Sequence, residues 1–215
     1  GSTDRTVDIA REHGARILVE SEWKGPSIQR NRGMAAAQYD WCLLLDADEW
    51  VTDGLRDEIM ALEPTDAEAA YRCPRLSSYC GRFMHHGGWR PDYIVRLVNR
   101  RYARYEGGIV HDHCVPSGVV GTLDHSLMHE PYRTLDQVLA KSNAYSSWGA
   151  EDMVKSGRNG SLARAILHGF WAFWRTYFIR GGFLDGRHGF MLAVSNAETT
   201  YYKYLKAMLL ADEGR

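Results

Sequence analysis

Short apolar runs alternate with helix-like stretches in the first third of the chain. The strand predicted over 41–45 contains four consecutive apolar side chains, a run typical of a strand buried on both faces of a sheet. A second short strand is predicted over 15–20. Helices are predicted over 4–13, 26–37 and 53–62, each beginning at a residue suited to a helix start. Helices between short apolar strands favour a layered, mostly parallel α/β sheet with right-handed crossovers.

The later part of the chain follows a different pattern. Strands are predicted over 70–77 and 92–99, and the glycine pair between them indicates a turn or a close backbone approach. Two helices rich in aromatic residues are predicted over 162–179 and 190–210. The stretch from Gly157 to Gly160 is the candidate hinge. The predicted organisation is therefore an α/β domain over 1–156 followed by a helical region over 157–215.

Three carboxylates follow the strand predicted over 41–45. Asp46 and Asp48 are separated by one alanine, and Glu49 comes next. Ligands bind at this end of the strands in open α/β sheets. We expect the backbone to turn here, because a turn is needed to bring both carboxylates to the same ligand. Asp46 and Asp48 are therefore a candidate site for Mg²⁺ or Mn²⁺ with nucleotide phosphates, and the alternative is a solvated acidic turn.

Composition narrows the function only slightly. Lys and Arg total 26 against 27 Asp and Glu, a net charge of −1, which offers no overall basic surface for nucleic acid. The four cysteines, at 42, 73, 80 and 114, show no paired short spacing, so we expect them to be reduced and the protein to be cytoplasmic, without a signal peptide. The His, Asp and Cys residues over 111–114, with His85 and His86, have the atoms of a zinc site but not its ligand spacing.

Several short motifs, in order, resemble the family 2 glycosyltransferases of the GT-A fold. They are Gly1-Ser2-Thr3-Asp4, Gln29-Arg30-Asn31-Arg32-Gly33, Asp40-Trp41 and the Leu-Asp-Ala-Asp-Glu run over 45–49. Later motifs are similar to the lipopolysaccharide core β-1,4-glucosyltransferase branch (WaaE/KdtX type): Gly87-Gly88-Trp89, Arg96-Leu97, Val110-His111-Asp112, His129-x-x-Tyr132 and Gly182-Phe183-Leu184-Asp185-Gly186. The resemblance covers nearly the whole chain. It implies that a first strand, helix and second strand of the catalytic domain are missing from this numbering.

The resemblance implies roles for a base and a metal site. Asp112 matches the acidic residue of the family's Val-His-Glu/Asp motif, and it would remove the proton of the acceptor hydroxyl in an inverting transfer. His129 would complete the metal site of Asp46 and Asp48, and the neighbouring His125 could exchange roles with it. Judged from the residues alone, Asp112 could equally be a solvated loop residue and His129 a surface histidine.

Further residues are implied for the donor and the acceptor. Asp4, Arg30 and Asn31 would bind the donor, with Arg30 and Asn31 reaching its diphosphate. The alternative for these two is an exposed basic helix face. Trp89 and Arg96 fall in the region where GT-A proteins build the acceptor side.

The segment over 162–179 is densely aromatic, with arginines interleaved. It is too short and too charged for a membrane span, but it suits a helix lying in a bilayer interface. Trp171, Trp174 and Arg175 are expected to contact lipid or a lipid-borne acceptor, and further arginines would meet anionic head groups: Arg158, Arg164, Arg180 and Arg187. The alternative is packing on the sheet or on a second subunit, which would make the protein a homo-oligomer.

These expectations together describe an inverting, metal-dependent glycosyltransferase that acts at the inner-membrane surface. Its donor would be a nucleotide sugar, a UDP-sugar by resemblance, and its acceptor a lipopolysaccharide-core or other lipid-linked glycan. One alternative is a nucleotidyltransferase-like, phosphate-handling enzyme on a similar sheet. Another is a non-catalytic membrane-associated module, which would tolerate the loss of Asp48.

Overall fold

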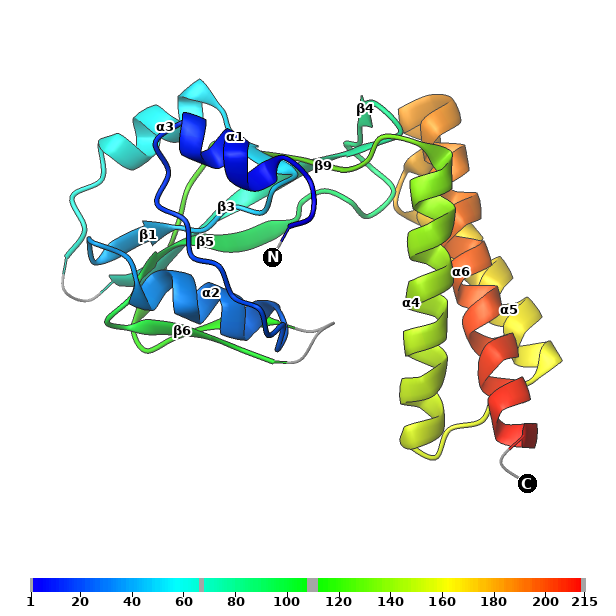
Figure 1. Cartoon of the computed structure of the whole chain (residues 1–215). Helices are drawn as coiled ribbons and strands as arrows, with labels where there is room; N and C mark the ends of the chain where they lie inside the picture. Colours follow the sequence, from blue (N-terminus) through cyan, green and yellow to red (C-terminus); the bar gives the residue numbers. More distant parts are fainter. Residues whose placement is uncertain (1, 66–67, 108–111, 214–215) are drawn as a thin grey trace. The chain divides into compact units, whose positions relative to one another are not determined.

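The computed structural model describes residues 2–65, 68–107 and 112–213, which form two compact units (Figure 1). Unit 1 comprises the residues up to Leu45 together with Ala61–Cys73 and Val95–Leu123. Unit 2 comprises Asp46–Met60, Pro74–Ile94 and the residues from Asp124 onward. Strands β3 (Glu68–Tyr79) and β5 (Tyr93–Asn99) contribute residues to both units.

Unit 1 is a small α/β assembly. Its other elements are α1 (Thr6–Glu12), α2 (Pro26–Ala35), β1 (Trp41–Leu43), β6 (Ala103–Glu106), β7 (His113–Pro116) and β8 (Val119–Thr122). β1 pairs antiparallel with β5, the first part of β3 pairs parallel with β8, and β6 pairs antiparallel with β7. Helix α2 packs against β6, and its Met34 enters a core with Ala70, Val98 and Tyr105.

Unit 2 combines a short sheet with a bundle of helices. Its other elements are β2 (Glu49–Val51), α3 (Asp53–Met60), β4 (Arg82–Phe83), β9 (Leu127–Tyr132), α4 (Leu135–Lys155), α5 (Leu162–Trp174), the π-helical turn η1 (Arg175–Ile179), the 3₁₀ turn η2 (Gly182–Asp185) and α6 (Gly186–Glu213). β9 pairs parallel with the second part of β3 and antiparallel with β2. The predicted α/β class is confirmed, and the sheet is mixed, with parallel neighbours along β3.

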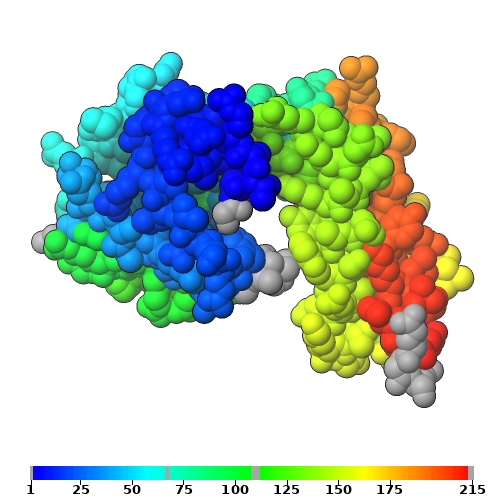
Figure 2. All heavy atoms as spheres, viewed as in Figure 1, coloured from blue at the N-terminus to red at the C-terminus, as the bar shows by residue number. Residues whose placement is uncertain are grey.

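Helices α4 and α5 pack along the long helix α6 (Figures 1 and 2). The face of α5 that meets α6 carries small side chains, Ala165, Gly169 and Ala172, and all three are buried. A Cβ on Gly169 would lie 3.2 Å from Cβ of Tyr201, so a larger residue would push the helices apart. Several larger apolar side chains of α5 stay exposed, among them Leu167, Phe170 and Trp171, while Phe173 packs against Phe190 of α6.

Two strand predictions were wrong in part. Residues 15–20 form no strand in the described part of the chain, because a strand needs a neighbour to complete its hydrogen bonds and no ladder pairs with this run there. β1 ends at Leu43 rather than Leu45, and both leucines are exposed. β1 stands at the end of the strand order, with β5 as its neighbour among the described strands. It is therefore not the strand buried on both faces that its apolar run predicts.

Helix α4 is absent from the sequence-based expectations, although its start carries a capping signal. The hydroxyl of Thr134 accepts from the backbone N–H of Gln137 at 3.3 Å, and the Gln137 side chain accepts from the N–H of Arg133 at 2.8 Å. Because α4 packs with α6, the helical part begins well before residue 157. The division of roles between 1–156 and 157–215 stays a prediction.

Candidate active site

The Asp-Ala-Asp-Glu sequence forms a tight turn. The backbone N–H of Glu49 donates to the carbonyl of Asp46 at 3.0 Å, and the Glu49 carboxylate accepts from the N–H of Asp46 at 3.1 Å. The turn is thus closed by both the backbone and a side chain. Glu49 is only 8% exposed, so its carboxylate is buried and makes its contacts within the protein. This is the turn that the spacing of Asp46 and Asp48 requires.

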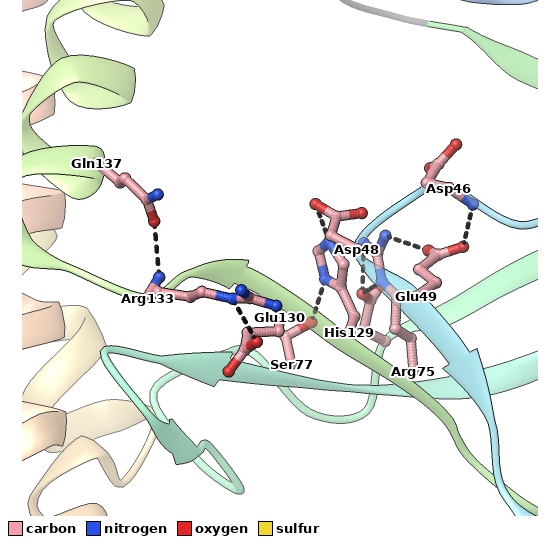
Figure 3. A network of polar contacts seen from close by, with 10 residues as sticks. Asp46, Asp48, Glu49, Arg75, Ser77, His129, Glu130, Arg133 and Gln137 are labelled. Carbon is pink, nitrogen blue, oxygen red and sulfur yellow. Dashed lines mark hydrogen bonds and ion pairs between the residues drawn. The ribbon is translucent and has the colours of Figure 1, made fainter. Parts of the chain in front are cut away.

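Arg75 on β3 compensates the buried charge of Glu49. Its Nη1 lies 3.5 Å from Oε1 of Glu49, while its Nε and Nη2 lie 2.9 and 2.8 Å from Oδ2 of Asp92. A buried carboxylate is costly unless it is paired and hydrogen-bonded. The chain of contacts from Asp92 through Arg75 to Glu49 therefore supports the turn that carries Asp46 and Asp48, and Figure 3 shows the contact between Arg75 and Glu49.

His129 faces Asp48 from the neighbouring strand. Strand register sets Ser77, His129 and Glu49 level with one another on β3, β9 and β2. Nε2 of His129 lies 3.5 Å from Oδ2 of Asp48, and its Nδ1 lies 2.8 Å from the hydroxyl of Ser77. Burial, and next the charge of Arg75, lower the pKa of His129 below its usual 6.5, against the opposite pull of Asp48 and Glu49. This direction favours the neutral form of the ring at pH 7.

These residues open onto a cavity of ≈ 660 Å³ in unit 2. Its walls include Asp46, Asp48, Arg75, Ser77 and His129 from the turn and strands, Gly88, Trp89, Pro91 and Asp92 from the loop before β5, Pro131 and Tyr132 from β9, and Lys141 and Tyr145 from α4. In Figure 3 the carboxylate of Asp48 turns toward the His129 ring, whereas that of Asp46 points away from it. Acidic, basic and aromatic side chains thus line the same cavity, as the binding of a polar substrate would require.

Asp48 and His129 are suited to hold a divalent metal together. If His129 donates its Nδ1 proton to Ser77, its Nε2 presents a lone pair toward Asp48, which is how proteins orient histidine ligands. Among the described residues, no group of three or more His, Cys, Asp or Glu side chains could hold a metal ion. Two protein ligands still fit Mg²⁺ or Mn²⁺ at a nucleotide site, because phosphate oxygens and water supply the others. The metal requirement stays a prediction.

Asp112 and Arg30 form an ion pair in unit 1. Both side chains are largely buried, and the Arg30 guanidinium also lies 5.2 Å from the centre of the Tyr105 ring. The alternative of an exposed basic helix face therefore does not hold at Arg30, and its role toward the donor stays a prediction. The first two residues of the Val-His-Asp motif, Val110 and His111, lie outside the described residues, and the zinc alternative that includes His111 stays untested.

Asn31 is engaged in a structural contact. Its side-chain amide donates to the carbonyl of Tyr105 at 2.8 Å, and its side-chain oxygen accepts from the N–H of the same residue at 2.9 Å. Asn31 therefore holds α2 to β6 in the way that a strand neighbour would.

Asp4 makes a local contact within its own turn. Its carboxylate accepts from the N–H and hydroxyl of Thr6 at 3.1 and 2.6 Å. Those two hydrogen bonds lower the pKa of Asp4.

Of the residues expected on the acceptor or membrane side, Trp89 lines the cavity, and the others fall into two groups. Arg96 is 2% exposed and lies inside unit 1, so it does not form part of a binding surface there. Trp171 and Trp174 on α5 are 51% and 43% exposed, and Arg175 of η1 is also exposed. None of the described helices combines the length and apolar character needed to cross a membrane.

Sequence reasoning missed several residues of the cavity. Arg75 and Ser77 lie on a predicted strand, but which of its side chains meet His129 depends on a pairing register that no local pattern reveals. Lys141 and Tyr145 belong to α4, a helix that is not among the elements predicted from the sequence. The capping signal at Thr134 would have found the helix, although not the face that lines the cavity.

Comparison with known proteins identifies the family. The model of glycosyl transferase family 2 matches residues 1–119. The chain is 32% identical over 208 residues to an uncharacterized glycosyltransferase of Rickettsia bellii, covering 88% of this chain and 68% of that protein. It is 30% identical over 226 residues to another of Rickettsia typhi, covering 100% and 77%. It is 29% identical over 220 residues to the lipopolysaccharide core biosynthesis glycosyltransferase LpsC of Rhizobium meliloti, covering 96% and 78%. The chain therefore belongs to glycosyl transferase family 2 and is an inverting glycosyltransferase.

Proposed function

We propose that the protein transfers a sugar from a nucleotide sugar, a UDP-sugar by family resemblance, to a lipopolysaccharide-core or other lipid-linked acceptor in a metal-dependent reaction. The observation that carries this proposal is the pairing of Asp48 with a neutral, Ser77-oriented His129 at the wall of a polar cavity. A carboxylate beside a neutral imidazole is a ligand set for Mn²⁺ or Mg²⁺ in the presence of phosphate.

Asp48 and His129 would hold the metal, and Ser77 would keep the His129 ring in its ligating orientation. A bound divalent cation would supply positive charge against the diphosphate leaving group. Asp46, whose carboxylate points away from the His129 ring, would contact the donor from the same turn. Glu49 and Arg75 keep the turn in the conformation that presents both aspartates.

Asp112 is the proposed general base. The acceptor oxygen would attack C1 of the sugar as its proton passes to the Asp112 carboxylate and the bond from C1 to the diphosphate oxygen breaks. Arg30 pairs with this carboxylate. The acceptor hydroxyl would therefore compete with a guanidinium for the same oxygens, and Arg30 would control when Asp112 can accept the proton.

A lipid-linked acceptor is supported by the outer face of α5. Large apolar side chains recur every four residues along α5 and into η1, and all are exposed: Leu162, Ile166, Phe170, Trp174 and Phe178. No Asp or Glu occurs between 153 and 184, whereas five Lys or Arg residues do. An apolar stripe flanked by cations suits an anionic bilayer surface. Two copies of this face would bring like charges together, which favours lipid over self-association.

The name of LpsC and the later sequence motifs support lipopolysaccharide core as the acceptor class. Membership of family 2 favours glycosyl transfer over nucleotidyl transfer. A non-catalytic role is disfavoured by the same membership and by the polar cavity around Asp48.

The direct test is acceptor-dependent release of UDP. Purified protein would be mixed with a panel of UDP-sugars, lipopolysaccharides of progressively truncated core, and Mn²⁺ or Mg²⁺. The proposal expects UDP release with one donor and acceptor pair, loss of release in EDTA, and recovery when metal is restored. Undiminished turnover in EDTA would overturn the metal assignment. Pyrophosphate release from nucleoside triphosphates, without sugar transfer, would instead indicate the nucleotidyltransferase alternative.

Membrane association has its own test. Wild type should float with vesicles containing anionic lipid, less so at high salt, and a variant with Trp171→Ser and Trp174→Ser should stay behind while remaining folded. Trp148→Ser on α4 is the matched control, because Trp148 is as exposed as Trp174 but lies off the α5 stripe. Wild type that fails to float would show that the stripe serves another contact.

A further inference from the structure

A buried carboxylate in the C-terminal region holds the loop that follows β4. Asp185, at the end of η2, is 3% exposed. Its Oδ2 accepts from the backbone N–H groups of His85 and His86 at 3.0 and 2.8 Å, and its Oδ1 lies 3.1 Å from Nδ1 of His86. Asp185 thus accepts hydrogen bonds from the N–H groups of two consecutive residues and also contacts the His86 ring, and such charge-assisted bonds are the stronger kind.

The loop held by Asp185 becomes the wall of the cavity within a few residues. Gly88, Trp89, Pro91 and Asp92 all line that cavity. Between the clamp and the wall, the N–H of Gly87 donates to the carbonyl of Arg180 at 2.8 Å. The loop is therefore fixed to the C-terminal region by both side-chain and backbone contacts before it reaches the cavity.

Two glycines allow this path. Gly87 and Gly88 have φ values of +71° and +85°, which other residues rarely adopt. A Cβ on Gly87 would lie 3.1 Å from Cδ2 of Leu192 on α6, and a Cβ on Gly88 would collide with the side chain of Arg180. The loop follows the surface of η1 and α6 closely because it lacks side chains there.

Trp89 is the residue that this arrangement positions. Its ring lies 5.9 Å from the ring of Tyr79 and 6.2 Å from that of Tyr132, measured between centres. The hydroxyl of Tyr79 lies 2.7 Å from that of Ser195 on α6. The aromatic cluster that includes Trp89 is therefore linked to α6 through the Tyr79 hydroxyl. Asp185 holds the loop that carries Trp89.

We propose that Asp185 is a positioning residue for the acceptor: through His85 and His86 it holds the Gly87-Gly88-Trp89 wall in place for the sugar of the acceptor. This proposal rests on the proposed function, because it takes the cavity as the place of sugar transfer. The donor is held by different residues, around Asp48 and His129, which Asp185 does not touch. Loss of the clamp should therefore impair transfer to the acceptor more than it impairs use of the donor.

The test compares Asp185→Ala with wild type in two measurements. The first is hydrogen exchange at the N–H groups of His85 and His86, which should become at least about tenfold faster when their buried acceptor is removed. The second is the ratio of transfer onto truncated lipopolysaccharide to slow hydrolysis of the UDP-sugar by water. Misplacement of the wall should lower transfer by roughly 10- to 100-fold, with donor hydrolysis changed by less than about threefold.

Two further variants separate positioning from general destabilisation. Asp185→Asn keeps an oxygen for the two N–H groups and should restore part of both losses. Gly88→Ala keeps the carboxylate but displaces the loop from Arg180, so it should reproduce the loss of transfer even where Asp185→Ala fails to fold. Ser146→Ala is the control, because Ser146 is a buried polar residue of α4 that bonds Lys206 of α6 and does not touch the loop.

The outcomes are distinct. Faster exchange with unchanged transfer would overturn the positioning role and leave Asp185 purely structural. Equal losses of transfer and hydrolysis would also overturn it. If wild type transfers and hydrolyses no nucleotide sugar, the proposed function fails instead, and the exchange measurement still shows whether Asp185 holds the loop.

Discussion

The candidate residues of unit 1 and those of unit 2 are both predicted from sequence motifs, but their side chains make different contacts in the structure. In unit 2, Asp48 and His129 line an open cavity, and the contacts behind them orient their side chains. In unit 1, Arg30 and Asp112 pair with each other, and Asn31 uses both ends of its amide on Tyr105. Motif spacing gives no sign of this difference, because it identifies residue types and not their partners.

The difference separates residues that support the fold from residues that are available to a substrate. A side chain whose hydrogen bonds are complete within the protein contributes to stability, and its loss leaves buried groups unsatisfied. A side chain that faces a cavity costs little stability when it is replaced, but its chemistry is lost. Substitution of a cavity residue in unit 2 should therefore lower activity more than stability. Substitution of a paired residue in unit 1 should lower stability more than activity.

The largest expected effect is that of Asp48→Asn on sugar transfer. Loss of this ligand should lower turnover by roughly a thousandfold, since charge stabilisation by a metal amounts to several kcal/mol. The melting temperature should stay close to that of wild type, because Asp48 is partly exposed at the cavity wall. Asp53→Asn, at an exposed carboxylate on α3, is the control and should keep full activity. Near wild-type turnover of Asp48→Asn would remove the metal site from the proposed function.

Asp112→Asn tests whether a paired residue of unit 1 also has a catalytic role. If Asp112 is the base, kcat should fall by about 10²- to 10⁴-fold while the dissociation constant for UDP changes little. If Asp112 only completes an ion pair, Asp112→Asn and Arg30→Ala should lower the melting temperature alike and leave kcat unchanged. The two outcomes are measured on the same proteins, by steady-state kinetics and thermal unfolding.

Asn31→Ala should show the reverse of Asp48→Asn. It leaves the N–H and carbonyl of Tyr105, a buried residue, without their side-chain partner, so the free energy of unfolding should fall by about 1–3 kcal/mol. The folded variant should keep kcat/KM within about threefold of wild type. Asn31→Asp, which keeps the acceptor and loses the donor, should fall between. A loss of donor affinity without a loss of stability would restore Asn31 to the donor site.

Local signals predicted the helices of this fold better than its strands. Pro26 marks the start of α2, and the apolar spacing of the C-terminal segment anticipated α5 and α6. The apolar run over 15–20 reads as a strand, but a strand depends on a partner, and none pairs with it in the described part of the chain. The exposure of Leu43 has the same cause, since a local pattern cannot specify which neighbours a strand will have.

The sequence predicts only those residues of the candidate site that belong to recognisable motifs. Asp46, Asp48, His129 and Trp89 were named from the sequence, and they do line one cavity. Arg75 was not, because its contact with Glu49 depends on the register of separate strands. The clamp at Asp185 joins positions about a hundred residues apart, and no spacing rule connects them.

The smallest expected effect is on pH dependence and concerns His129. Burial and the charge of Arg75 lower the pKa of His129 below 6.5, so the unfolded chain binds a proton more readily than the folded protein does. Stability should therefore fall as the pH drops below 6.5 toward the folded-state pKa, and it should be retained above 6.5. His129→Gln should flatten this part of the melting-temperature profile. His188→Gln is the control, because burial lowers the pKa of His188 as well, yet only the His129 variant should lose the added stability that UDP with Mn²⁺ gives at pH 7. Equal stabilisation of both variants by UDP and Mn²⁺ would mean that His129 titrates as a structural residue and holds no metal.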